Sequence, residues 1–276
     1  MAYERLGESA LDYYPCRYGK SKLLFRGPRK RLEKPYVAII GGTETYGKFV
    51  ENPFPNVLEN SLGQPVVNLG CINAGIDAFS NDDAILGICS DAAVTVVQIP
   101  GAQNMSNRYY SVHPRRNDRF LKASRLLATI YSDVDFTEFH FTRHLLTELF
   151  EKSPEKFELV RQELKDAWVG RMIAMLNKIG GKIVLLWMAD HAPGENPTNQ
   201  PLGHDPMFVD RAMLEAISVR TLDLVEVAVQ PDEVAAGFDR MIYTALEEPA
   251  AMEMLGPVAH EAVAKKLHDA VGRLLK

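Results

Sequence analysis

Cysteine is scarce in this sequence. The chain of 276 residues has three cysteines and no C-x-x-C spacing; they are Cys16, Cys71 and Cys89. An odd number without that spacing argues against a disulfide framework and against a cysteine-based zinc site. We therefore expect reduced and mostly buried thiols in a cytoplasmic protein.

Long apolar runs and an excess of positive charge are also missing. No uncharged apolar stretch reaches the roughly 18 residues of a membrane helix, and the opening segment MAYERLGESALDYYPCRYG has no apolar core of a signal peptide. The net charge of -5 argues against a general nucleic-acid binder, which is usually basic. We expect no membrane span and no nucleic-acid partner, but a small-molecule or carbohydrate substrate. Self-association as a homo-oligomer stays open.

Apolar strand patterns alternate with amphipathic helix patterns along most of the chain. Strands are predicted at 36–40, 65–70, 92–100, 182–189 and 222–229, and helices at 46–62, 78–90, 117–132, 136–151, 154–179, 210–217 and 258–275. Continuously apolar strands separated by helices are typical of a parallel sheet covered on both faces. The sequence thus predicts a three-layer α/β/α sandwich with a mainly parallel five-stranded sheet.

Three segments organise this prediction. Residues 35–276 form a single α/β domain, with a helical insertion at about 117–179, and residues 1–34 form an arm that packs on the domain through aromatic residues. In such folds the site lies beyond the carboxyl ends of the strands. That rule selects four loops: 41–47, 70–77, 100–108 and 190–206.

The first of these loops reads GGTETYG, from Gly41 to Gly47. Its two glycines let the backbone turn sharply and approach a ligand, and the following helix offers free N–H groups. The loop lacks the Gly-Lys-Ser/Thr ending of a P-loop and is not G-x-G-x-x-G, so no nucleotide cofactor is predicted. The alternative is a plain strand-to-helix turn in which Thr43 caps the helix.

The order of these loops resembles the SGNH (GDSL-type) hydrolase superfamily. Its first block, Gly-Asp-Ser-x-Thr-x-Gly, is similar to residues 41–47, and its second, Asn-x-Gly-x-x-Gly-x-Gly, to residues 68–75. Its third block, Gly-x-Asn-Asp, resembles residues 101–104. The last block, Asp-x-x-His, ends at the position of His260 in GPVAHEAVAKKL. The resemblance implies an SGNH- or flavodoxin-like fold.

The resemblance also implies roles for individual residues. Thr43 stands where the family has its nucleophilic serine, and His260 stands where the family has its base. The N–H groups of Thr43 and Asn73, with the side chain of Gln103 or Asn104, then bind the oxyanion. In this reading His260 takes the proton of Thr43, which attacks an ester or acyl carbonyl.

The sequence departs from the family pattern at several places. Gly42 replaces the aspartate of the first block, and Pro257 stands three residues before the histidine, where the triad aspartate is expected. A complete triad is therefore not visible. Asp190, Asp205 and Glu261 remain alternative partners that could orient the histidine.

A basic segment follows the loop after the third strand. Arg115, Arg116 and Arg119, with Arg108 upstream, could clamp a phosphate, sulfate or carboxylate group, and His113 could titrate beside them. This pattern supports a second function, a sulfotransferase-like or other anion- or carbohydrate-binding protein of the same fold. A solvated basic turn capped by Asn117 is the plainer alternative.

Two histidine-containing features complete the candidates. His140 and His144 are four residues apart in a predicted helix and share one face, as a metal pair would, yet no H-E-x-x-H is present and no metal site is predicted. The long loop 190–206 carries the pairs Asp190-His191 and His204-Asp205. Loops of this length are often functional, although a partner contact or a lid is an alternative.

The function predicted from the sequence is a divergent SGNH-like hydrolase or acyltransferase acting on an ester-bearing small molecule, sugar or lipid. A sulfotransferase-like or anion-binding protein is the alternative, and a non-catalytic scaffold of the same fold is the third.

Overall fold

Five parallel strands form the central sheet of the molecule. The computed structural model describes residues 11–33, 35–196 and 202–276. The strands are β1 (Val37–Gly41), β2 (Val66–Gly70), β3 (Val94–Gln98), β6 (Ile183–Ala189) and β7 (Asp223–Ala228), in the order β2-β1-β3-β6-β7. Every neighbouring pair is parallel. The predicted five-stranded parallel sheet is confirmed, and its order is the flavodoxin-like 2-1-3-4-5.

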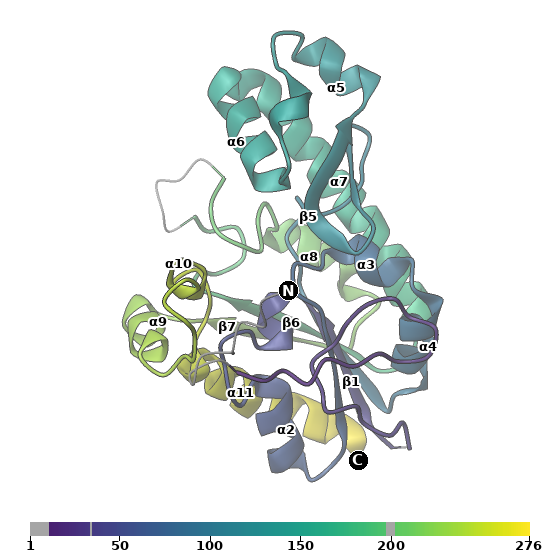
Figure 1. Cartoon of the computed structure of the whole chain (residues 1–276). Helices are drawn as coiled ribbons and strands as arrows, with labels where there is room; N and C mark the ends of the chain where they lie inside the picture. The colour runs from purple at the N-terminus through teal and green to yellow at the C-terminus, as the bar shows by residue number, and fades with distance from the viewer. Residues whose placement is uncertain (1–10, 34, 197–201) are drawn as a thin grey trace, which may run out of the picture.

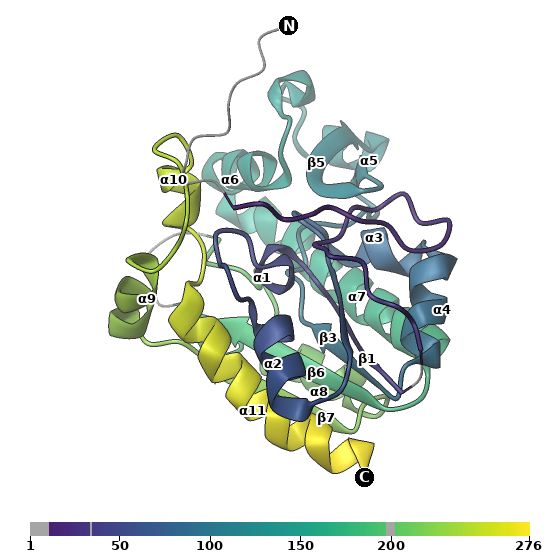
Figure 2. The same ribbon diagram turned by 60° about the horizontal axis from the view of Figure 1, so that its bottom comes forward.

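Helices cover both faces of the sheet, which explains why its central strands are continuously apolar. One face packs against α3 (Ile76–Ser80), α4 (Asp83–Asp91), α7 (Pro154–Ile179) and α8 (Arg211–Ser218). The other packs against α2 (Phe54–Leu62) and α11 (Pro257–Leu275). Figure 2 shows α2 and α11 on one side of the strands and α7 on the other. The three-layer α/β/α prediction is therefore confirmed.

The proline and aspartate residues set several helix boundaries that the sequence pattern merged. The helix predicted at 46–62, with an interruption at Pro53 and Pro55, is helical beyond Tyr46 only from Phe54 onward, because α1 (Thr43–Tyr46) ends at Gly47 and α2 begins after Pro53. The predicted helix 78–90 is two helices, α3 and α4, and the Asp82 side chain caps α4 by accepting from the Ile85 N–H.

The prediction of a helix at 117–132 is wrong for its first half. Residues there form a hairpin of β4 (Tyr110–His113) and β5 (Arg116–Ala123), which lies with α5 (Arg125–Ile130) and α6 (Thr142–Lys152) above the sheet in Figure 1. The chain turns at Pro114, and Ser124 caps α5, so no helix begins before residue 125. Of the predicted helix 136–151, only α6 and a short 3-10 turn (Phe136–Glu138) are helical.

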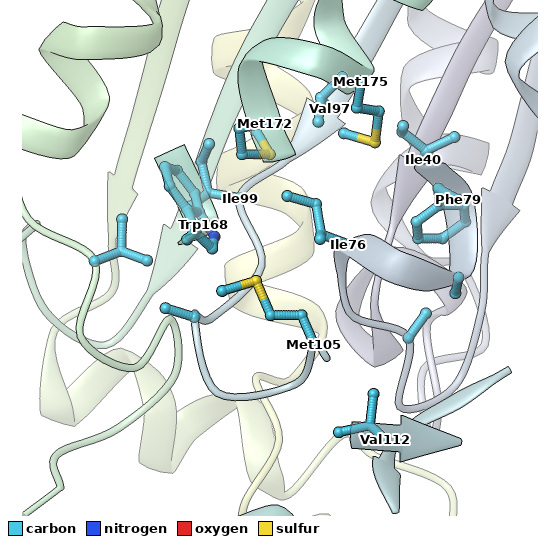
Figure 3. Packing of buried hydrophobic residues seen from close by; sticks show 14 of the residues in the cluster. Ile40, Ile76, Phe79, Val97, Ile99, Met105, Val112, Trp168, Met172 and Met175 are labelled. Atoms are coloured by element: carbon cyan, nitrogen blue, oxygen red, sulfur yellow. The ribbon is translucent and has the colours of Figure 1, made fainter. Parts of the chain in front are cut away.

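The hairpin, α5 and α6 (residues 110–152) are here called the insertion, and the long helix α7 connects them to the sheet. Figure 3 shows Trp168, Met172 and Met175 of α7 facing Val97 and Ile99 at the end of β3. The Trp168 indole N–H also donates to the Pro100 carbonyl oxygen at 3.0 Å. The same helix therefore fixes the start of the loop after β3.

Between β7 and α11 the chain forms α9 (Pro231–Phe238) and α10 (Glu248–Ala251), which the sequence pattern did not predict. In the ranges that the structure describes, no helix combines the length and the apolar character needed to cross a bilayer.

The described part of the N-terminal arm packs on the turn that follows α1. The guanidinium of buried Arg26 donates to the carbonyl oxygens of Gly47, Val50 and Glu51 at 2.5, 2.7 and 2.7 Å. Tyr13 adds a hydroxyl that accepts from the Phe49 N–H at 2.9 Å. Burial lowers the pKa of Arg26, so these carbonyl oxygens compensate for a desolvated charge.

We predict that Arg26→Ala destabilises the protein by about 3 kcal/mol or more, because two buried carbonyl oxygens and one partly buried carbonyl oxygen lose a charged donor. Urea unfolding measures this change. Arg31→Ala is the matched control, because the Arg31 side chain is 89% exposed, and should change stability by less than about 0.5 kcal/mol. Equal stability of both variants would contradict the anchoring role of Arg26.

Candidate functional site

The loops after β1, β2 and β3 meet at the carboxyl edge of the sheet, where the strand order reverses between β1 and β3. Open α/β sheets bind ligands at this switch point. The Gln98 side-chain oxygen accepts from the Gly42 N–H, the Thr45 N–H and the Thr45 hydroxyl, at 3.1, 3.2 and 2.5 Å. Gln98 thereby fixes the turn after β1 to the end of β3.

A second buried amide ties the loop after β2 to the insertion. The Asn117 side-chain oxygen accepts from the N–H groups of Gly75 and Ala78 at 2.9 and 3.0 Å. A Cβ on Gly75 would overlap the Asn104 carbonyl oxygen, so the loops after β2 and β3 approach as closely as glycine permits. Asn117, predicted as the cap of a solvated turn, is instead fully buried and holds this junction.

Thr43 lies at the centre of this junction, at the start of α1. Its hydroxyl oxygen accepts from the Asn73 backbone N–H at 3.0 Å and lies 3.3 Å from the Asn73 side-chain oxygen. Asn73 has a φ of 56°, a left-handed conformation that asparagine tolerates better than most residues. The structure therefore brings together Gly42, Thr43 and Asn73.

Asp118 extends this contact, although nothing in the sequence pattern singles it out beyond its place in a basic segment. Its carboxylate accepts from the Asn73 side-chain amide at 3.0 Å, which turns the Asn73 oxygen toward Thr43. The second carboxylate oxygen is buried and has no hydrogen-bond partner among the described residues. Burial raises the pKa of Asp118. A backbone hydrogen bond, the charges of Arg119 and Arg116 and the hydrogen bond from Asn73 lower the pKa, but the effect of burial is larger.

His260 lies on α11, on the α2 side of the turn, and its ring is fully buried. Its Nδ1 accepts from the Phe54 N–H at 3.0 Å, and its Nε2 lies 3.7 Å from the Glu44 carboxylate. Both ring nitrogens thus face groups other than Thr43, and the structure does not bring the predicted pair together by a hydrogen bond. The role of His260 as base stays a prediction, and Glu261 pairs with Arg240 instead.

The two predicted oxyanion side chains have other partners. The Gln103 amide donates to Asp205 at 2.6 Å, and the Gln103 side chain is buried. The Asn104 side-chain oxygen accepts from the Thr142 hydroxyl at 2.6 Å, which connects the loop after β3 to α6. Both residues lie at the carboxyl edge of the sheet, where Gln103 connects the loop after β3 to the loop after β6 and Asn104 connects it to α6.

The loop after β6 is described except for residues 197–201, where part of the predicted loop 190–206 lies outside the described residues. Asp190 accepts from two imidazoles, His191 at 2.7 Å and His204 at 2.5 Å. Burial raises the pKa of Asp190, but the two hydrogen bonds and the nearby histidines outweigh it and lower the pKa to about 2. Asp190 is therefore ionised at neutral pH.

The other predicted residues lie on the insertion. Arg115 and Arg116 are exposed at the turn of the hairpin, where their backbone N–H groups donate to the Nδ1 of His113 at 3.3 and 3.2 Å. His140 and His144 are both exposed, and the His144 ring packs edge-on against Phe139. In the described part of the chain, no group of three or more His, Cys, Asp or Glu side chains is arranged so that it could hold a metal ion.

Residues 1–275 match a family described as Domain of unknown function (DUF6473). The chain belongs to this family. No curated protein matches it. Among solved structures, this DUF6473 chain is similar to a lipase from a goat rumen metagenome, at 12% identity and a TM-score of 0.43, over 86% of this chain and 97% of the lipase.

A gut microbial enzyme described as diltiazem-metabolizing is also similar, at 13% identity and a TM-score of 0.33, over 86% of this chain and 47% of that one. Similarities this distant carry no argument about function. The function of the DUF6473 chain is therefore argued from its own residues.

We predict that Gly75→Ala destabilises the protein by about 1–3 kcal/mol, because the new methyl group forces the loops after β2 and β3 apart. Gly87→Ala is the matched control: this exposed helical position has open space around it, and alanine should stabilise α4 by up to about 1 kcal/mol. Thermal unfolding of both variants separates the two effects. A Gly75→Ala protein as stable as wild type would contradict the close approach.

We also predict that Asp118→Asn stabilises the protein at pH 7. Because the folded pKa of Asp118 is raised, the folded state binds this proton more readily than the unfolded state. The contribution of the Asp118 carboxyl group to the free energy of unfolding of the wild type therefore falls as the pH rises through the raised pKa. The advantage of the variant should shrink as pH falls toward about 4, where the unfolded carboxyl group is also protonated. Asp133→Asn, at an exposed position, serves as the control when melting temperatures are measured as a function of pH. A stability advantage of Asp118→Asn that grows in acid would refute the raised pKa of Asp118.

Proposed function

We propose that this protein is a divergent SGNH-like hydrolase or acyltransferase acting on an ester-bearing small molecule, sugar or lipid. One observation carries the proposal: the Thr43 hydroxyl and the Asn73 N–H lie 3.0 Å apart at the switch point of the sheet. These two groups correspond, in the resemblance, to the nucleophile and to an oxyanion donor.

In the proposed reaction, the Thr43 hydroxyl oxygen bonds to the ester carbonyl carbon while a basic side chain takes the hydroxyl proton. The bond from this carbon to the leaving oxygen then breaks, and the alcohol leaves with that proton. The N–H groups of Thr43 and Asn73 stabilise the oxyanion, each by about 3 kcal/mol if they act as such donors usually do. A bound carbonyl oxygen would take the Asn73 N–H from the Thr43 hydroxyl, which frees the hydroxyl lone pair for attack. The ordered turn, fixed by Gln98, keeps these groups in place before substrate arrives.

We predict that Thr43→Val lowers the hydrolysis of p-nitrophenyl acetate by about 1,000-fold or more, whereas Thr43→Ser retains activity. Valine keeps the shape of threonine and removes only the hydroxyl. Thr129→Val is the control, because Thr129 is exposed on α5 and its hydroxyl donates to the Arg125 carbonyl oxygen of the same helix. Full activity of Thr43→Val would exclude Thr43 as the nucleophile.

A sulfotransferase-like or other anion-binding function is the second candidate. It is favoured by the exposed guanidinium groups of Arg115, Arg116 and Arg119 on the hairpin that carries Asp118. The positive charge of Arg116 has a lowering effect on the pKa of both Cys71 and Asp118, so its electrostatic influence extends to the loop after β2. In this function, the arginines bind a phosphate or sulfate group above the same edge of the sheet.

For this second function, inorganic phosphate or sulfate should raise the melting temperature, and the double variant Arg115→Ala/Arg116→Ala should remove the shift. Arg125→Ala, on the exposed surface of α5, is the control. The absence of a shift for wild type with either anion would rule out this candidate.

A further inference from the structure

Asp190 and two histidines form a second polar cluster at the carboxyl edge, outside the Thr43 site. Asp190 follows directly after β6, and each of its carboxylate oxygens accepts from the Nδ1 of one imidazole, at 2.7 Å from His191 and 2.5 Å from His204. An ionised carboxylate that binds Nδ1–H leaves the lone pair of a neutral imidazole on Nε2. The cluster thus sets the tautomer of both rings.

The two histidines differ in their surroundings. His191 is buried, its ring packs edge-on against Trp187, and its carbonyl oxygen accepts from the Trp187 indole at 2.7 Å. The His204 side chain is 34% exposed. Among the residues that the structure describes, only Asp190 hydrogen-bonds the His204 ring. His191 therefore supports Asp190, and His204 is the histidine that a substrate can reach.

The segment that carries His204 is held firmly at the edge of the sheet. The Gln103 amide donates to Asp205 at 2.6 Å, and the Ala102 N–H donates to the Met207 carbonyl oxygen at 2.9 Å. Arg143 of α6 donates to the Gly203 carbonyl oxygen at 3.0 Å. These bonds attach both sides of His204 to the loop after β3 and to the insertion.

We propose that His204 is the proton-transfer residue of this site and that Asp190 is its positioning residue. This inference rests on the proposed hydrolase function. Thr43 follows β1 and Asp190 follows β6, and only β3 lies between these strands. With strands about 5 Å apart, the ends of β1 and β6 are about 10 Å apart, so an ester above the end of β3 can contact both the loop of Thr43 and the loop of His204.

In the proposed step, a bond forms between the attacking hydroxyl oxygen and the carbonyl carbon, and His204 Nε2 takes the hydroxyl proton, directly or through one water. The bond from the carbonyl carbon to the leaving oxygen then breaks, and the same proton passes from Nε2 to that oxygen. Asp190 holds the ring and stabilises its charged form. His260 does not suit this step, because its Nδ1 already accepts from Phe54 and its ring is fully buried.

The test measures hydrolysis of p-nitrophenyl acetate, butyrate and laurate by the full chain. His204→Ala should lower kcat by about 100- to 10,000-fold, and free imidazole should restore part of the activity. Asp190→Asn should lower kcat with little change in KM, and nitrogen NMR should show that the Nδ1 proton of His204 is no longer preferred. His268→Ala and Asp223→Asn are matched controls, since both residues lie away from the carboxyl edge, with Ser61 and Arg273 as partners.

The outcomes separate this inference from the proposed function. Wild-type activity in His204→Ala, with Thr43→Val inactive, would overturn the role of His204 and leave the hydrolase proposal standing. Loss of activity in His204→Ala without rescue by imidazole would also overturn it. Rescue of His204→Ala while Thr43→Val stays active would support His204 and remove Thr43 as nucleophile. A wild-type protein that hydrolyses none of the three esters would overturn both proposals.

Discussion

The geometry of the site depends on one side-chain oxygen. Gln98, at the carboxyl end of β3, accepts three hydrogen bonds from the turn that carries Thr43. A buried amide oxygen with three donors is costly to leave unpaired, so the turn has one stable position relative to β3. A Cβ on Gly41 would overlap this amide and the Thr45 hydroxyl, which explains why glycine ends β1. The orientation of Thr43 is therefore a property of two neighbouring strands and not of the turn alone.

The insertion takes part in the site through the same kind of contact. Asn117 of the hairpin binds the loop after β2, Thr142 of α6 binds Asn104, and Arg143 binds the segment beside His204. The hairpin and α6 thus hold three of the four loops at the carboxyl edge. The helix α7 runs from the insertion onto the sheet. A movement of the insertion would therefore be transmitted to the loop after β3 through the hydrogen bond between Trp168 and Pro100.

The sequence predicted the strands well, because buried parallel strands are continuously apolar, and it predicted that their loops share one edge of the sheet. It failed where side chains contact residues far along the chain. The hairpin was missed because the polar residues of β5 conceal its buried Asn117 and Phe120. Gln98 could have been noticed as the one strongly polar residue ending an apolar strand. The partners of His260, Phe54 and Glu44, are set by the packing of α11 on α2, which spacing along the chain does not encode.

The central claim is that the turn after β1 carries a nucleophile. It is tested most directly by trapping the covalent intermediate: the wild-type protein is mixed with a p-nitrophenyl ester or a fluorophosphonate, quenched in acid, digested and sequenced by mass spectrometry. We expect one acyl or phosphonyl group on Thr43. Hydrolysis of the ester with the group on another residue, or with no covalent group on the turn from Gly41 to Gly47, would contradict it.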